Sequence, residues 1–161
     1  MSARPADLAT LQREAMHPTS GGSADRRRDA GRTLNSADEF RKTAQLCRSD
    51  GLRLPVISNL HEAARLAITA VAASRGLRFA NRPAAHVAVV DYALAIQIVN
   101  RTEWAQLDEL RDLRHKTNYP SDLIEPTDVE LDQFSALTDT VVARARSKIA
   151  PIPPPPRRKA R

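Results

Sequence analysis

The sequence has little of the residues on which many folds and chemistries depend. Its 161 residues include one cysteine, five glycines and only 4% aromatic residues. A single cysteine excludes an intramolecular disulfide and a cluster of cysteine metal ligands. The scarcity of aromatic residues, together with many alanines and leucines, favours helices over a sheet. The length suits one domain with a sizeable core.

Long hydrophobic runs are also missing. No apolar stretch reaches the roughly 18 residues that a membrane span requires, and the N-terminal residues lack the apolar core of a secretory signal. We therefore expect a soluble, cytoplasmic protein without a membrane partner.

The positive charge lies at the two ends of the chain. The formal net charge is +6, yet residues 33–150 contain equal numbers of acidic and basic side chains. This distribution excludes a globally basic domain that coats nucleic acid. One hypothesis left open is that the two basic ends contact phosphates, which would give weak binding that ignores sequence and falls steeply with salt.

The ends also differ from the middle in composition. Residues 1–35 combine prolines, glycines and the run Arg26–Arg28, and we expect a disordered basic arm. Residues 150–161 hold five prolines followed by basic residues, which predicts an extended proline-rich tail. The folded domain is expected over residues 36–149.

Five helices are predicted within this domain, so the fold class is all-α, a compact bundle. Apolar periodicity and end signals place them at residues 36–51, 55–76, 83–99, 100–119 and 127–149. Pro55 suits a first turn, and Gly51 and Gly76 suit helix ends. Three helices begin with the pattern of a capping box, formed by Ser36 with Glu39, Asn100 with Glu103, and Thr127 with Glu130.

The helix at residues 83–99 is apolar on most sides, which indicates a central position or an oligomer interface. We interpret His61 and His86 as structural or surface residues. Trp104 is interpreted as a packing anchor rather than a platform for stacking bases.

The end of the fourth helix is the candidate site. Arg111, His115 and Asn118 recur at spacings of four and three residues, and Arg114 follows Arg111 by three, so they can share one patch. Arginine offers a planar fork to phosphate, and histidine moves protons near neutral pH. Such groups can cleave RNA without a metal, because the 2′-hydroxyl is a built-in nucleophile.

An ordinary charged helix end explains the same residues. Asp108 can pair with Arg111, and Asp112 with Lys116, at helical spacing. Cations in a last turn also complement the helix dipole.

Other chemistries lack their motifs. The sequence has no phosphate-cradling glycine loop, no His-Glu-x-x-His motif and no Gly-x-Ser-x-Gly elbow. The four histidines do not show metal-ligand spacing. We therefore expect neither a cofactor nor a metal.

The layout resembles the HEPN superfamily, a compact bundle in which an arginine- and histidine-bearing turn precedes a long closing helix. Residues 113–119, LRHKTNY, look like an arginine–polar–x–x–x–tyrosine variant of its motif. Arg114 matches the family arginine, His115 the polar neighbour, and Tyr119 stands about where the family has histidine.

This resemblance implies a homodimer whose motif turns face each other across a cleft and act on RNA without metal. Catalytic roles are expected for Arg111, Arg114, His115 and Tyr119, and substrate contacts for Lys116 and Asn118. The protein would be a ribonuclease, or a degenerate relative that binds RNA, in a toxin–antitoxin or defence system with a nucleotidyltransferase-like partner. The alternative is a non-catalytic interaction subunit, based on the apolar helix at residues 83–99 and the two tails.

Overall fold

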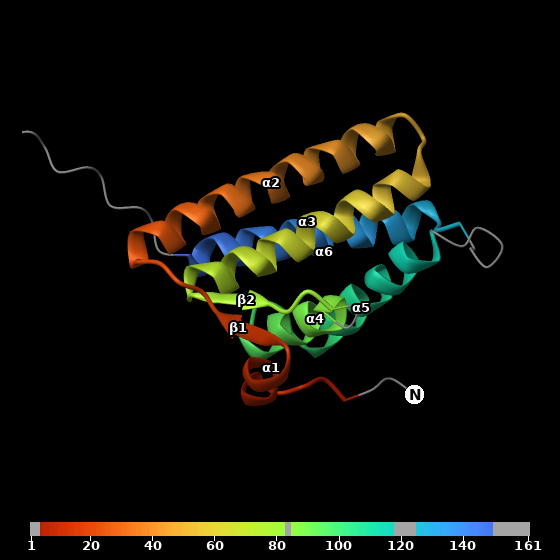
Figure 1. Cartoon of the computed structure of the whole chain (residues 1–161). Helices are drawn as coiled ribbons and strands as arrows, with labels where there is room; N and C mark the ends of the chain where they lie inside the picture. The colour runs from red at the N-terminus through yellow and green to blue at the C-terminus, as the bar shows by residue number, and fades with distance from the viewer. Residues whose placement is uncertain (1–3, 83–84, 118–124, 150–161) are drawn as a thin grey trace, which may run out of the picture.

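A computed structural model describes residues 4–82, 85–117 and 125–149 (Figure 1). These ranges contain six helices and one two-stranded sheet. The helices are α1 (Leu8–Glu14), α2 (Ser23–Ser49), α3 (Arg53–Ser74), α4 (Ala85–Ala95), α5 (Arg101–Lys116) and α6 (Asp128–Lys148). The strands are β1 (Met16–Pro18) and β2 (Leu77–Phe79). The expectation of a helical bundle is confirmed, with six helices in the described ranges rather than five.

Helix α3 is the centre of the bundle. It contacts α2, α4, α5 and α6, and Figure 1 shows it running between α2 on one side and α4 and α5 on the other. Small side chains let neighbouring helices approach its surface closely, and five of its alanines are fully or almost fully buried: Ala63, Ala64, Ala67, Ala70 and Ala72.

The expected disordered arm over residues 1–35, and a first helix starting at Ser36, are wrong for the part of this segment that is described. Helix α2 begins at Ser23, with Gly22 as its N-cap, and passes through Ser36 without interruption. Its buried residues Ala30, Leu34 and Ala37 recur at helical spacing, so the apolar face of the helix begins before Ser36. The predicted tail at residues 150–161 lies outside the described residues.

The N-terminal segment is held by the small antiparallel sheet. Met16 pairs with Phe79, and Pro18 with Leu77. The ladder is extended by a 2.8 Å bond from the Thr19 amide to the Gly76 carbonyl. Gly76 has a φ of +74°, a conformation that favours glycine, and so ends α3 as expected and turns the chain into β2.

Capping explains the starts of α5 and α6. Asn100 with Glu103, and Thr127 with Glu130, form the predicted capping boxes. Glu103 also accepts a 2.7 Å hydrogen bond from Arg144 of α6, which ties the first turn of α5 to that helix. A further ion pair of 2.6 Å, between Arg48 and Asp128, links α2 to the start of α6.

Helix α4 is shorter than the predicted 83–99. It ends at Ala95. Gln97 has a φ of +59°, a left-handed conformation that a right-handed α-helix does not contain. Its residues from Ala88 to Ala93 are buried within the chain, whereas His86 and Val87 of its first turn are exposed. None of the described helices combines the length and the hydropathy that a bilayer crossing needs.

Candidate functional site

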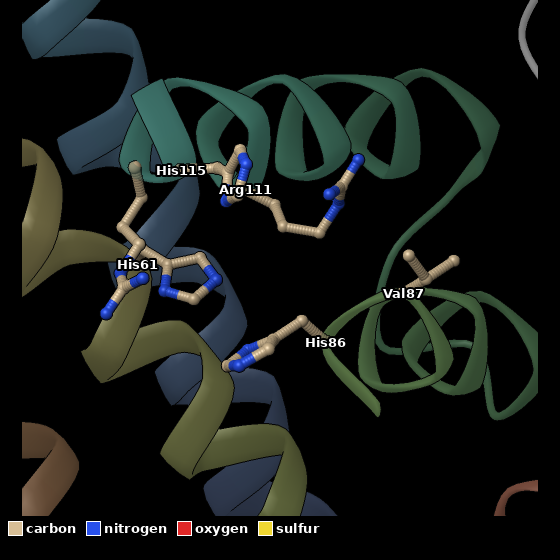
Figure 2. Close-up of a pocket in the computed structure, with 6 residues that line it drawn as sticks. His61, His86, Val87, Arg111 and His115 are labelled. Atoms are coloured by element: carbon tan, nitrogen blue, oxygen red, sulfur yellow. The ribbon is translucent and has the colours of Figure 1, made fainter. Parts of the chain in front are cut away.

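Three helices meet around a cavity of about 190 Å³. Figure 2 shows the side chains that α3, α4 and α5 direct toward it. The lining consists of His61 from α3, His86 and Val87 from α4, and Arg111, Arg114 and His115 from α5. The predicted patch on α5 therefore faces two histidines that lie far from it in the sequence.

The packing of α5 explains why its cationic residues face this cavity. Leu107 and Leu110 are buried in the core, so the neighbouring polar side of the helix borders the gap toward α3 and α4. Arg111 donates a 2.8 Å hydrogen bond from Nε to Asp108. Arg114 is half-buried and forms no ion pair with any residue that the structure describes. Its charge is thus available to the cavity.

His61 is enclosed at the α3 side of the cavity. Only 5% of the residue is exposed, and its Nδ1 has no hydrogen-bond partner among the described residues. Burial lowers the pKa of His61 to about 4, and the nearby positive charge of Arg114 acts in the same direction, against the opposing effect of Glu62. The ring is therefore neutral at pH 7.

His86 lies next to His61 but is exposed. The two ring centres are 5.8 Å apart, with the ring planes inclined by 43°. Desolvation and the cations Arg65 and Arg114 lower the pKa of His86. An imidazole that is neutral at pH 7 can accept a proton.

One carboxylate lies close to the histidines. Glu62 receives hydrogen bonds from both Nε and Nη2 of Arg65, the first at 2.9 Å. These bonds keep the pKa of Glu62 below its ordinary value despite its partial burial. The pair leaves no net charge there, and the positive charge of the cavity comes from α5.

The structure brings together three of the six predicted site residues: Arg111, Arg114 and His115. Lys116 instead pairs with Asp112 at 2.9 Å and lines a separate hollow beside Glu125 and Glu130. Asn118 and Tyr119 lie outside the described residues.

His61 and His86 were not predicted as site residues. A usable signal existed for His61, which follows Ile57 by four residues on the inner stripe of its helix and so had to face inward. Trp104, interpreted as a packing anchor, is 8% exposed and donates from Nε1 to the buried Asp91, which confirms that interpretation.

Metal binding is not supported by the donors in place. In residues 4–82, 85–117 and 125–149, no three side chains of His, Cys, Asp or Glu are grouped so that they could hold an ion. Arg111 and Arg114 would also repel a cation from the histidine pair.

The described part of the chain is thus a helical bundle with a cationic, histidine-containing cavity at the junction of three helices. No family model, curated protein or solved structure matches the chain.

Because His61 is buried, the free energy of unfolding should depend on pH. In the unfolded chain His61 takes up a proton near pH 6.5, but in the folded protein only near pH 4. The unfolded state therefore binds more protons between these values, and stability falls as the pH is lowered. As the pH falls from 7 to 5, this residue should lower the free energy of unfolding by about 2 kcal/mol. Urea denaturation at the two pH values measures the difference.

The comparison with His61→Leu isolates this contribution. The variant should lose less stability over the same interval, while His17→Leu, at an exposed position, should behave like the unaltered protein. An identical loss in the protein and in His61→Leu would contradict the prediction.

Proposed function

We propose that the protein acts on RNA at this cavity, as a metal-independent ribonuclease of HEPN-like type. The observation that carries the proposal is the convergence of His61, His86, Arg111, Arg114 and His115 on one cavity. The guanidinium group of arginine can donate two parallel hydrogen bonds to phosphoryl oxygens. The imidazole ring of histidine can transfer protons at neutral pH.

The reaction needs no reactant beyond the RNA. The 2′-oxygen attacks the adjacent phosphorus, the bond from phosphorus to the 5′-oxygen breaks, and a 2′,3′-cyclic phosphate and a free 5′-hydroxyl result. His86, which is neutral, accepts the proton of the 2′-hydroxyl. His115 gives a proton to the 5′-oxygen as it leaves.

The placement of the two histidines supports these roles. His86 belongs to α4 and His115 to α5, so they border the cavity from different helices (Figure 2). Arg114 and Arg111 stabilise the charge that develops on the phosphoryl oxygens. His61 is neutral and enclosed, so it borders the cavity without adding charge.

The proposal includes a HEPN-like homodimer in which the two cavities face a shared cleft. It also includes a role beside a nucleotidyltransferase-like partner in a toxin–antitoxin or defence system. Val87 supports a contact at this edge, because it is apolar, 43% exposed and on the cavity lining. The alternative of a non-catalytic interaction subunit rests on the apolar helix at residues 83–99 and on the two tails. The residues Ala88–Ala93 of that helix are covered by the chain itself, so we prefer the ribonuclease.

The test is cleavage of RNA by purified protein in the presence of EDTA. We expect products that end in a 2′,3′-cyclic phosphate, and no cleavage of DNA of the same sequence, which lacks the 2′-hydroxyl. His86→Ala and His115→Ala should each reduce the rate by about 10²–10⁴-fold. His17→Ala, which removes an exposed histidine outside the cavity, serves as the matched control. Equal cleavage by all four proteins, or cleavage by none, would contradict the proposal.

A further inference from the structure

Further hollows adjoin the cavity at His86. This residue lines two further hollows. One is a small hollow of about 10 Å³, bordered mainly by apolar side chains such as Ile68 and Leu107. The other is a chamber of about 290 Å³, which we call the β2–α4 chamber. Because His86 lines all three hollows, the first cavity and the β2–α4 chamber adjoin each other at this residue.

The β2–α4 chamber is cationic. It is lined by Arg65 and Thr69 of α3, by Arg78 and Phe79 of β2, and by Asn81 and Arg82 of the following segment, besides apolar residues and His86. No acidic residue is among its described lining. Arg65 is neutralised by Glu62, whereas Arg78 and Arg82 are exposed and pair with no acid in the described ranges.

The chamber also contains a fixed aromatic ring. Phe79 packs against the fully buried Tyr92 in a T-shaped arrangement, with ring centres 5.5 Å apart and planes at 82°. Packing of this kind holds the ring in one orientation. A ring flanked by arginines, with the amide of Asn81 and the hydroxyl of Thr69 nearby, resembles in chemistry the surfaces on which single-stranded bases stack.

We propose that the β2–α4 chamber binds the nucleotide next to the scissile phosphate, so that the substrate is a single RNA strand lying across His86. Arg78 and Arg82 contact its phosphate, and the base lies against Phe79. A duplex does not fit this role, because its bases are stacked and paired and cannot reach a ring in a hollow. This inference rests on the proposed function, which places the scissile phosphate in the first cavity.

The experiment compares two probes on the full chain by titration. One is uridine 3′-monophosphate, which can occupy only one subsite. The other is a fluorescent five-nucleotide 2′-O-methyl RNA, which can reach both the first cavity and the β2–α4 chamber and cannot be cleaved. Each is titrated against the unaltered protein, Arg78→Ala/Arg82→Ala and Arg114→Ala. The control Arg32→Ala/Lys42→Ala removes two exposed charges from α2 that form no ion pair within the described residues.

We expect the five-nucleotide probe to bind the unaltered protein at least about tenfold more tightly than the monophosphate. Arg78→Ala/Arg82→Ala should remove this advantage and leave monophosphate binding unchanged. The slope of log affinity against log salt should fall by about 0.7, the value for one lost phosphate contact with a single strand. The α2 control should retain the advantage.

Two results overturn the inference in distinguishable ways. If the monophosphate binds, and binds more weakly to Arg114→Ala, but the longer probe gains nothing, the β2–α4 chamber is not a subsite and the proposed function stands. If the monophosphate binds nowhere, the proposed function falls and the inference falls with it. An equal loss in Arg78→Ala/Arg82→Ala and in the α2 control would assign the effect to overall charge and also overturn the inference.

Discussion

Arg114→Ala is expected to lower kcat/KM for RNA cleavage by about 10²–10³-fold, the usual cost of removing one group that stabilises charge in a transition state. Arg114 is the cation of the cavity that no described acid neutralises, and its charge acts on both His61 and His86. The measurement is the initial rate of cleavage of a fluorescent RNA under conditions far below saturation.

Two companion variants make this prediction specific. Arg111→Ala should cost less, about tenfold, because Asp108 already accepts a hydrogen bond from Arg111 and offsets its charge. Arg101→Ala removes an exposed arginine from the opposite end of the same helix, where the side chain lies 5.8 Å from the ring of Trp104, and should leave the rate unchanged. If Arg101→Ala and Arg114→Ala reduced cleavage equally, the role of Arg114 would be refuted.

Arg114→Lys separates charge from geometry. Lysine keeps the positive charge but cannot present two parallel N–H groups to a phosphoryl group. We expect a rate between those of the unaltered protein and Arg114→Ala. Full recovery by lysine would show that charge alone is sufficient.

The sequence predicts the start of a helix best where side chains accept hydrogen bonds from the free backbone amides of its first turn. Asn100 and Thr127 do this, and their capping boxes are present. Ser36 belongs to the same pattern, yet it lies inside α2, because Ala30 and Leu34 add buried positions upstream that a local motif does not reveal. A capping motif is thus informative only where the apolar stripe does not continue before it.

The small sheet was not predicted, for a different reason. Each strand has three residues, too few to show an alternating pattern. Their pairing joins Met16 to Phe79, which lie far apart in the sequence, and pairing between distant segments depends on the tertiary fold rather than on local propensity.

The candidate site was predicted in part. Arg111, Arg114 and His115 lie within five residues of one another, so helical spacing alone groups them. His61 and His86 come from two other helices, and no spacing rule connects them to α5. Only the packing of α3, α4 and α5 brings all five together, and a cavity built in this way has no sequence motif.

The geometry of the cavity therefore depends on how α4 is fixed against α5. A polar contact between the two helices is made by Asp91 of α4, which is 7% exposed. One carboxylate oxygen accepts a 3.0 Å hydrogen bond from Nε1 of Trp104 in α5, and the other accepts a 3.0 Å bond from the backbone amide of Ala6. A single buried side chain thus joins α4, α5 and the segment before α1.

Asp91→Ala should lower the free energy of unfolding by about 2–4 kcal/mol. The substitution leaves the buried indole N–H and the Ala6 amide without their acceptor, and each unsatisfied donor costs about 1–3 kcal/mol. Urea denaturation followed by circular dichroism measures the loss. Emission from Trp104, the only tryptophan, should shift to longer wavelength as its surroundings become more polar. Asp29→Ala, at an exposed position of α2, should stay within about 0.5 kcal/mol of the unaltered protein.

A double-mutant cycle with Trp104→Phe tests whether the bond itself is responsible. In the Trp104→Phe variant Asp91 has lost its indole partner, so Asp91→Ala should cost less there, by about 1 kcal/mol or more. The remaining cost then measures the bond to Ala6 and the packing of the carboxylate. If Asp91→Ala cost the same in both backgrounds, the link between α4 and α5 would contribute nothing to stability, and the position of His86 relative to Arg114 would have to be fixed by apolar packing alone.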